Sequence, residues 1–269
     1  MRFSKFLVVE FEVTAMIWVI KKRQILTALA LLTLTVALSA ACAFGGVVEA
    51  VSGKKRKLPV YGVETDEKVV ALTFDAAWGA DKTAGIVKTL NDFGADATFF
   101  LVGFWIDAFP KETVMIRENG FEIGNHSDHH LEMSKLSAEK IEEEILSVNR
   151  RIEELTGCTP KFFRPPFGDY NDRLVEGVEK QGMIAVQWSV DSLDWKGLSA
   201  EAIATRVLKG AKNGSIILFH NNSDNILGAL PLVLTALKNK GYKFVKLSEL
   251  VYTENYVIGP DGTQRLNKV

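Results

Sequence analysis

Four histidines lie just after, or at the end of, segments that we predict to be β-strands. Two of them, His126 and His130, are four positions apart in the run NHSDHH. If a strand ends at Asn125 and a helical turn follows, both imidazoles lie on one face and can share a metal ion, whereas His129 points elsewhere. The spacing alone favours two surface histidines, but the position of the pair after the predicted strand FEIGN, with Asn125 and Ser127 available to orient the ligands, favours metal binding. We therefore predict that His126 and His130 bind a metal.

An aspartate and an arginine also lie where predicted strands end. Asp75 follows the apolar run VVALTF, although strand interiors disfavour Asp. Arg164 precedes two prolines, which cannot continue a central strand and therefore force a turn. If both residues emerge at the same edge of a sheet, Arg164 keeps Asp75 ionised and oriented. The alternative interpretation is a structural salt bridge.

The fourth histidine, His220, ends the predicted strand SIILFH, and the run WSVDSLDW places Asp191, Asp194 and Trp195 after another strand. A carboxylate that reaches His220 raises its pKa and selects its tautomer, which suits a general acid near neutral pH. Trp188 is more typical of packing. For Trp195, packing and a platform that binds sugar are equally open, and we keep it as a candidate substrate-binding residue.

The elements that must position these side chains alternate between short apolar runs and amphipathic segments. The clearest amphipathic segment begins after Ser137, a suitable N-cap, and ends at Gly157, and its acidic run 142–144 is interpreted as a solvated face. Repeated strand and helix units predict an α/β fold with a parallel sheet, most economically closed into a (β/α) barrel of about seven strands, whose carboxyl ends carry the catalytic residues. The predicted strands are 69–74, 97–102, 121–125, 161–164, 184–190, 215–220 and 242–245.

Composition narrows the class of protein. Hydrophobic residues make up 47% of the chain and charged residues 24%, which indicates a folded domain. The net charge of −1 provides no field that would attract a nucleic acid, so we expect no nucleic-acid partner. The two cysteines, Cys42 and Cys158, are too few for a disulfide framework or a cysteine zinc site.

The N-terminal part differs from the rest of the chain. After three basic residues at 21–23, an apolar run continues without a charge until Glu49. We interpret residues 1–48 as a cleaved signal peptide or a membrane anchor, with export in either case, and Met16 is an alternative start. If the segment is not cleaved, it is the part of the chain that contacts a membrane. The remaining predicted parts are a linker at 49–67, one domain at 68–252 and a C-terminal tail at 253–269.

Five runs carry a resemblance to a known family. TFDAAWG, GNHSDHH, RPPFG, DSLDW and LFH occur in the order and approximate spacing of the motifs of polysaccharide deacetylases, carbohydrate esterase family 4. The sequence around GNHSDHH is similar to the corresponding sequences of peptidoglycan and sporulation-associated deacetylases of endospore-forming Gram-positive bacteria. The resemblance implies a distorted (β/α) barrel that binds a divalent ion, Zn²⁺ first and Co²⁺ as an alternative, and that hydrolyses N-acetyl groups of an N-acetylated cell-wall glycan.

The resemblance also implies a role for each candidate residue. The implied roles are Asp75 as general base, Arg164 as its orienting partner, His220 as general acid, Asp194 as the residue that tunes it, His126 and His130 as metal ligands, Leu218 as the lining of the acetyl pocket, and Phe167 as a backbone N–H donor to the oxyanion.

One position departs from the family pattern. The family usually carries a second aspartate directly after the base, as the third metal ligand, and here that residue is Ala76. Losing a group that merely orients a ligand typically costs about 10- to 100-fold in metal affinity or activity, so a missing ligand should matter at least as much. Compensation by Asp81, Asp128 or water is an alternative that the spacing does not support. Two further hypotheses are a barrel that binds glycan or a wall-assembly partner without catalysis, and a different carbon–nitrogen hydrolase, such as a cyclic-amide or formamide hydrolase.

Overall fold

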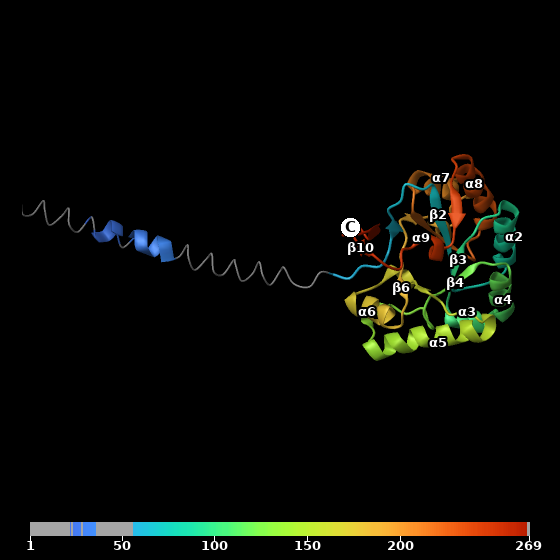
Figure 1. The fold of residues 1–269 in the computed structure, drawn as a ribbon, viewed down its shortest axis with the longest axis horizontal. Helices are drawn as coiled ribbons and strands as arrows, with labels where there is room; N and C mark the ends of the chain where they lie inside the picture. The colour runs from blue at the N-terminus through green and yellow to red at the C-terminus, as the bar shows by residue number, and fades with distance from the viewer. Residues whose placement is uncertain (1–21, 23, 28, 36–55, 268–269) are drawn as a thin grey trace, which may run out of the picture. The chain divides into compact units, whose positions relative to one another are not determined.

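The chain divides into two compact units, residues 1–56 and residues 57–269. In the first unit, the described residues between 22 and 35 are helical and exposed. No helix among the described residues is both long enough and apolar enough to cross a membrane. The predicted signal peptide or anchor at 1–48 lies largely outside the described residues, and so do Met16 and Cys42. The computed structural model describes residues 22, 24–27, 29–35 and 56–267 (Figure 1).

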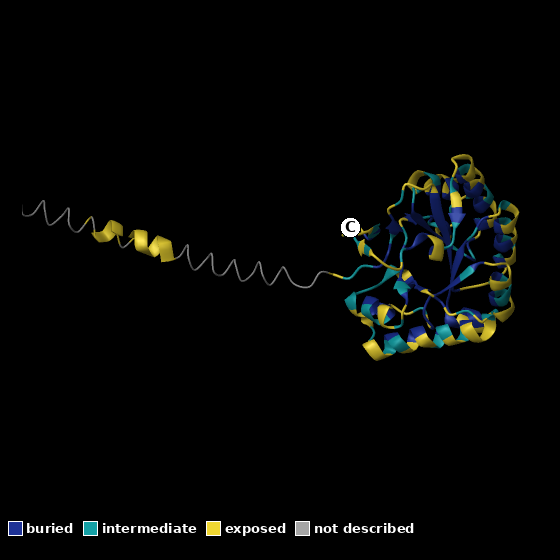
Figure 2. Ribbon diagram, in the orientation of Figure 1, coloured by how far each residue is buried: buried dark blue, intermediate teal, exposed yellow. Residues whose placement is uncertain are grey.

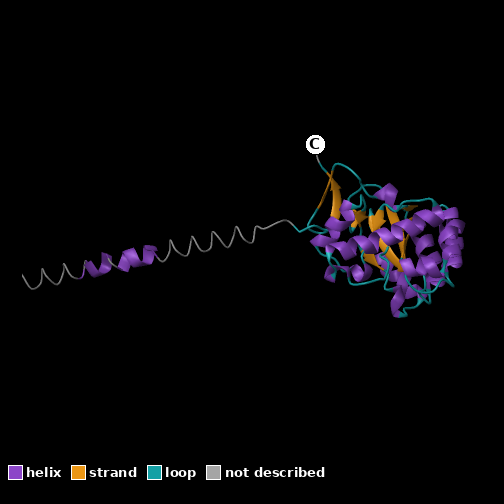
Figure 3. Ribbon diagram, turned by 90° about the horizontal axis from the view of Figure 1, so that it is seen from below, coloured by secondary structure: helices purple, strands orange, loops and turns teal. Residues whose placement is uncertain are grey.

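The second unit is built on a sheet whose strands lie inside a layer of helices (Figure 3). The predicted α/β fold is confirmed, because the strands that carry the candidate residues run parallel to one another. The register places Asp75 directly opposite His220 on the neighbouring strand. In order across the sheet, the parallel strands are β8 (Ser215–His220), β2 (Val69–Ala76), β3 (Thr98–Leu101), β4 (Glu122–Asn125), β5 (Phe162–Phe163) and β6 (Ile184–Ala185), and β9 (Lys243–Val245) pairs with the first residues of β2.

The helices begin and end at residues that favour these positions. Ser137 accepts a hydrogen bond from the Lys140 N–H at the start of α5, and Gly157 ends that helix in the left-handed conformation, both as predicted. The outer helix surfaces are exposed and their inner surfaces are buried against the sheet (Figure 2). The helices are α2 (Thr83–Phe93), α3 (Gly103–Ala108), α4 (Pro110–Glu118), α5 (Ala138–Thr156), α6 (Asp172–Lys180), α7 (Ala200–Gly210), α8 (Ile226–Asn239) and α9 (Leu247–Leu250), with 3₁₀ turns η1 (Met133–Lys135), η2 (Pro166–Gly168) and η3 (Asp194–Lys196).

The two faces of β2 have different surroundings. Leu72, Phe74 and Ala76 belong to the apolar core that also contains side chains of α2, α7 and α8. Ala71 belongs to a second apolar cluster, and Asp75 lines a cavity. Because successive side chains of a strand point to opposite faces, Asp75 faces the interior of the barrel and Ala76 faces the helices.

The barrel closes through a segment that we predicted to be linker. Val60 forms a parallel bridge with Val186, and its carbonyl accepts a hydrogen bond from the Gln187 N–H at 2.7 Å. The next residues form β1 (Gly62–Val63), which pairs with β8. This segment therefore joins β6 to β8 and completes the ring.

The same junction explains why the predicted strand 184–190 is wrong as a single element. It is two strands, β6 and β7 (Val190–Asp191), because the chain leaves β5 at Val186 and reaches β8 at Ser189, whose N–H donates to the Ile216 carbonyl at 3.0 Å. The strand changes its partner while the Val60 segment occupies the space between β6 and β8.

The predicted tail is also part of the sheet. Residues 253–269 contain β10 (Tyr256–Ile258) and β11 (Thr263–Leu266), which pair with each other, and β11 runs parallel to β1. The predicted boundaries at 67 and 253 therefore fall inside the second unit, which begins at Lys57. Short strands that pair mainly through their backbones have no strong side-chain period, which is why these were missed.

Candidate active site

A cavity of about 740 Å³ opens where the parallel strands end. Its walls come from the ends of β2, β4 and β8 and from the turns η2 and η3. Arg164 is the one predicted site residue that does not line it, and its side chain is fully buried behind Asp75. The predicted residues that do line the cavity are Asp75, His126, His130, Phe167, Asp194, Trp195, Leu218 and His220.

Arg164 holds Asp75 in the manner that the sequence predicts. The guanidinium Nη1 donates to Asp75 Oδ1 at 2.8 Å and to Thr73 Oγ1 at 2.9 Å, and Nη2 donates to the Gln187 carbonyl at 3.0 Å. The Arg164 guanidinium also lies over the ring of Phe100, 4.3 Å from its centre. Burial raises the pKa of the Asp75 carboxyl, but the charges of Arg164 and of the nearby histidines outweigh it, so the pKa lies below its ordinary value. Asp75 is therefore an ionised, fixed carboxylate.

The loop after β4 brings the two predicted metal ligands together, but not by a helical turn. Residues 126–132 have no helical structure, and Ser127 and His130 adopt φ values of 67° and 54°. This left-handed region is uncommon for residues with a side chain. The predicted helical turn is wrong, whereas the predicted proximity is present: the rings of His126 and His130 lie 5.0 Å apart between centres.

The hydrogen bonds of His126 decide which ring nitrogen is free. Nδ1 lies 2.7 Å from the Arg164 carbonyl oxygen, which can only accept, so Nδ1 carries the proton and Nε2 keeps its lone pair. Nε2 lies 3.4 Å from Asp75 Oδ2. Burial lowers the pKa of His126, and it also lowers the pKa of His130 to about 4. Both imidazoles are therefore neutral near pH 7, as metal ligation requires.

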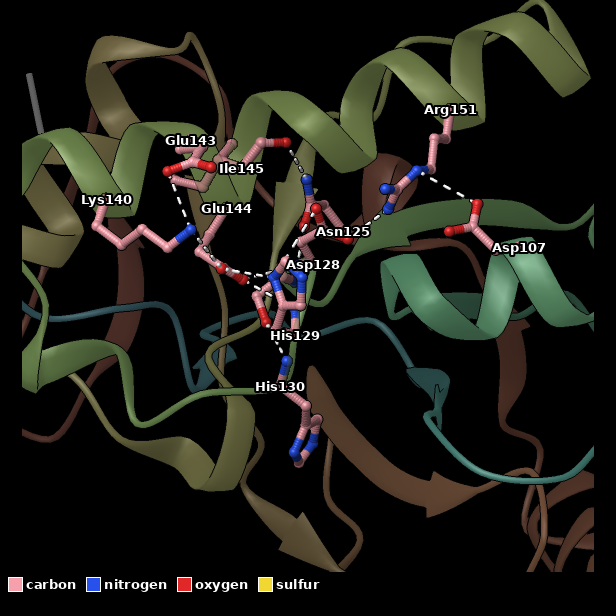
Figure 4. Close-up of polar contacts among 11 residues, drawn as sticks. Asp107, Asn125, Asp128, His129, His130, Lys140, Glu143, Glu144, Ile145 and Arg151 are labelled. Atoms are coloured by element: carbon pink, nitrogen blue, oxygen red, sulfur yellow. Dashed lines mark hydrogen bonds and ion pairs between the residues drawn. The ribbon is translucent and has the colours of Figure 1, made fainter.

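A buried carboxylate that we interpreted as solvated supports this loop. Glu144 of α5 is fully buried, and its Oε2 accepts the backbone N–H groups of Asp128 at 3.0 Å and His129 at 2.8 Å. Its Oε1 lies 2.8 Å from His129 Nδ1. Figure 4 shows Glu144 reaching from the helix to the loop, with the His130 ring directed away from that helix. The solvated interpretation of this residue is wrong, because Glu144 lies on the apolar stripe of α5, between Ile141 and Val148.

The rest of the loop is tied to the same helix. Asp128 pairs with Arg151, which also contacts Asp107 on α3 at 3.3 Å. The Asn125 amide donates to the Ile145 carbonyl at 2.8 Å (Figure 4). The Asn125 Oδ1 accepts the Ser127 N–H at 2.8 Å. Helix α5 thus holds this stretch before His126 and again between the two imidazoles, at Asp128 and His129, and neither of these residues lines the cavity.

His220 has a different environment. Its Nδ1 lies 2.8 Å from Asp194 Oδ1, and its backbone N–H donates to Asp194 Oδ2 at 2.9 Å. Burial lowers the pKa of His220, but the hydrogen bond and charge of Asp194 and the charges of Asp75 and Asp191 outweigh it, so the pKa lies above its ordinary value. With Nδ1 directed at Asp194, the Nε2 side of the ring is available to deliver a proton.

Two side chains near Asp75, those of His126 and His130, are suited to bind one divalent ion. His126 Nε2 has a lone pair that faces the Asp75 carboxylate, an arrangement of two electron-rich atoms that a cation would stabilise. His130 is neutral and lies beside it. Catalytic zinc sites ordinarily have three protein ligands. In the part of the chain that the structure describes, no group of three His, Cys, Asp or Glu side chains could hold a metal ion.

The candidates for a replacement ligand are engaged elsewhere. Ala76 is fully buried in the core between the sheet and the helices. Asp81 is exposed and pairs with Lys82 at 3.2 Å, and Asp128 pairs with Arg151. Neither aspartate lines the cavity. The residues present therefore fit an ion through His126 and His130, and the suggested compensation by Asp81 or Asp128 is wrong.

The predicted substrate-binding residues differ in exposure. Leu218 is buried on β8, whereas Phe167 and Trp195 are 65% and 59% exposed. Phe167 has a left-handed φ of 59° between Pro166 and a glycine, which fixes the turn after β5. This exposure excludes burial of Trp195 in the core, and its role as a platform for sugar stays a prediction. Trp188 is half-buried and also lines the cavity.

A further aromatic residue in the cavity wall, Trp78, was missed. It lies three residues after Asp75 in TFDAAWG and is 56% exposed. The available signal was a large apolar side chain in the turn after a catalytic strand, where no core can cover it.

Several known proteins are similar to this chain in fold and in sequence. The family model of polysaccharide deacetylase matches residues 62–186. A peptidoglycan-N-acetylglucosamine deacetylase of Bacillus cereus is 37% identical over 194 residues, covering 70% of this chain and 91% of that protein. The protein YlxY of Bacillus subtilis is 34% identical over 193 residues, covering 72% of this chain, which spans 60% of the length of that relative.

One solved structure bears on the missing third ligand. It is a CE4 family pseudoenzyme from Bacillus anthracis, 33% identical, with a TM-score of 0.70 over 71% of this chain and 68% of that one. The fold and the sequence agreement with a relative that is matched almost in full confirm the resemblance inferred from the five motifs. The chain belongs to the polysaccharide deacetylase family.

Proposed function

We propose that the second unit removes N-acetyl groups from amino sugars of a peptidoglycan-type glycan and releases acetate. The observation that carries this proposal is the surroundings of one carboxylate. Asp75 lies 3.4 Å from the lone-pair nitrogen of His126 and opposite His220 in the sheet register, so an ionised base, a neutral ligand and a histidine with a raised pKa share one cavity. The name of the Bacillus cereus relative supports the same substrate class.

The water-activating side of the site is formed by β2 and β4. Bound at His126 and His130, a divalent ion, proposed to be Zn²⁺ with Co²⁺ as an alternative, would supply Lewis-acid polarisation of the acetamide carbonyl. Asp75 accepts a proton from the attacking water, because Arg164 keeps its carboxylate ionised and directed into the cavity. Leu218 contacts the acetyl methyl group.

The leaving-group side is formed by β7 and β8. His220 donates a proton from Nε2 to the departing amine while Asp194 stabilises the charged imidazole. The Phe167 N–H, presented by the turn after β5, donates to the oxyanion that forms during attack. Trp195 contacts the sugar ring. The products are acetate and a free amino sugar.

The proposed location follows from the substrate. A peptidoglycan-type glycan lies outside the cytoplasmic membrane, so we propose export by the N-terminal segment, which is either cleaved or retained as an anchor. We propose a linker that ends near Arg56 and one domain that includes residues 253–269, and the division of the chain into two compact units supports these boundaries.

The test is acetate release from peptidoglycan and from chitin oligomers, measured on the full chain after chelation and after adding back single divalent ions. We expect release that depends on Zn²⁺ or Co²⁺. If no ion restores release while glycan binding is unchanged, deacetylation is wrong.

Ala76 favours a second candidate function, glycan binding without catalysis. With Ala76 in the core, the described residues provide two imidazoles and no third ligand, and a pseudoenzyme is among the structures of similar fold. The same measurement separates the two candidates, because the binding protein retains affinity for the glycan under every ion condition and releases no acetate.

A further inference from the structure

Three exposed aromatic rings form a continuous strip with His130 along one side of the cavity. The ring of Phe104 lies 6.4 Å from that of Trp78, which lies 4.9 Å from His130, which lies 4.5 Å from Phe167, all between ring centres. Phe104 is 36% exposed, and the other two side chains are exposed by more than half. We call Phe104, Trp78 and Phe167 the aromatic strip.

The aromatic strip extends beyond the site of chemistry. Trp78 and Phe167 line the cavity, whereas Phe104, at the start of α3, does not. The strip therefore leads from the ring of His130 out of the cavity and onto the surface. A ligand whose reacting part lies at Asp75 reaches Phe104 only if it continues past Trp78.

The backbone around Trp78 is held in place from beneath. The carbonyl of the next residue, Gly79, accepts the Trp105 indole N–H and the Asn221 amide N–H, each at 2.7 Å. Both donors come from fully buried residues. The N–H of Gly103, immediately before Phe104, donates to the Ser127 carbonyl at 3.0 Å. Because the platform is already ordered, a ligand that stacks on it loses little free energy to loop ordering.

The chemistry of the cavity indicates what kind of molecule stacks there. The strip consists of rings without an ionisable group, while the other walls carry the carboxylates of Asp191, Asp194 and Asp224. A pyranose has an apolar C–H face that suits an aromatic ring and hydroxyl edges that donate to carboxylates. A polyanionic ligand would be repelled by the same walls.

We propose that Trp78 and Phe104 bind the next sugar of the glycan, adjacent to the residue whose N-acetyl group enters the cavity. The ligand class is an uncharged oligomer of N-acetylated hexosamines at least two units long. This inference rests on the proposed function for the position of the first sugar. Trp78 contacts the sugar next to the reacting one, and Phe104 contacts the chain beyond it.

The experiment measures binding of N-acetylglucosamine oligomers of one to four units to the full chain in the presence of a chelator, by titration calorimetry. For the unmodified protein we expect the dissociation constant to fall as the oligomer lengthens. Phe104→Ala should weaken binding of the trimer and tetramer roughly 3- to 10-fold, the size of one lost aromatic contact, and leave the monomer unchanged. Trp78→Ala should flatten the length dependence altogether.

Conservative and remote variants complete the test. Trp78→Phe and Phe104→Tyr keep a ring and should restore most of the length dependence. Leu155→Ala removes an exposed apolar side chain from α5 and should change nothing. Because His130 touches Trp78 but not Phe104, the Phe104 variants remain informative if Trp78→Ala disturbs the loop.

The outcomes separate this inference from the proposed function. If the dissociation constant depends on oligomer length in the same way in Phe104→Ala and in the unmodified protein, the aromatic strip does not bind the glycan, even if acetate is released. Normal length dependence without acetate release supports the strip and overturns deacetylation. Loss of self-association in Trp78→Ala, with sugar binding unchanged, would identify a second copy of the chain as the occupant and also overturn the inference.

Discussion

Two regions of the cavity hold a histidine by the same nitrogen and leave it with opposite chemistry. His126 directs Nδ1 to a backbone carbonyl at 2.7 Å, and His220 directs Nδ1 to the Asp194 carboxylate at 2.8 Å. The pKa of His126 is lowered chiefly by burial, whereas that of His220 is raised, because the Asp194 carboxylate outweighs burial. A neutral oxygen selects a tautomer, and a charged one also stabilises the imidazolium. The first histidine therefore offers a lone pair and the second a proton.

The supports of the two regions differ as well. A backbone loop with two left-handed residues carries His126 and His130, and it depends on α5 through Glu144. His220 is the last residue of a regular strand and needs only Asp194. A loop with left-handed residues, held by α5, thus positions His126 and His130, whereas regular strand pairing positions His220.

Removing either histidine should be the most damaging change, and the two losses should differ in kind. We expect His220→Ala to lower the rate of acetate release about 10²- to 10⁴-fold, as loss of a general acid usually does, with bound metal nearly unchanged. His126→Ala should instead release the metal, because it removes a ligand. Metal content by elemental analysis, together with kcat, checks both variants. Equal loss of metal in the two would show that the histidines do not divide their roles in this way.

Asp194→Asn tests whether the carboxylate makes the difference. His220 must be protonated to act as an acid, so activity persists up to its folded pKa, which lies above the ordinary 6.5, and falls at higher pH. Without the Asp194 charge the pKa of His220 falls, and the alkaline limb of the pH–rate profile should move to lower pH. We expect kcat at neutral pH to drop by about 10²-fold or more, because the amide also disturbs the tautomer. An alkaline limb that stays in place would contradict the assignment.

Glu144→Ala should have a smaller effect, and it should act on metal binding by the loop that carries His126 and His130. Losing the group that holds a ligand loop typically costs about 10- to 100-fold in metal affinity. The amides of Asp128 and His129 should also exchange their hydrogens faster in the metal-free protein, because both donate to this carboxylate. Glu144→Gln keeps one acceptor and should be intermediate. The neighbouring, exposed Glu143→Gln is the matched control, and an effect of equal size there would remove the special role of Glu144.

Much of the scaffold was predictable because it depends on local patterns. β2, β3, β4, β8 and α5 follow from apolar periodicity, from Ser137 and from Gly157. The contacts of Asp75 with Arg164 and of His220 with Asp194 follow from one rule, that parallel strands bring their carboxyl ends to the same edge.

The remainder depends on tertiary structure. Left-handed φ values at Ser127 and His130 have no sequence signal, since neither residue is a glycine. Glu144 lies in an acidic run that resembles a solvated face, and only its spacing from Ile141 and Val148 places it on the buried stripe. The contact of Phe104 with Trp78 joins the start of α3 to the turn after β2, and their proximity follows from the neighbouring positions of β2 and β3.

The pairing of β1 with β11 affects the order in which this chain can fold. Gly62 and Val63 close the ring of strands, yet they are themselves paired with Thr263 and Gln264, about two hundred residues later in the sequence. A polypeptide that emerges N-terminus first, from a ribosome or from a translocation channel, cannot complete this seam until its last strand has emerged. The seam should therefore be among the last parts of the domain to form, and removal of residues 253–269 would leave β1 without its partner on the side away from β8.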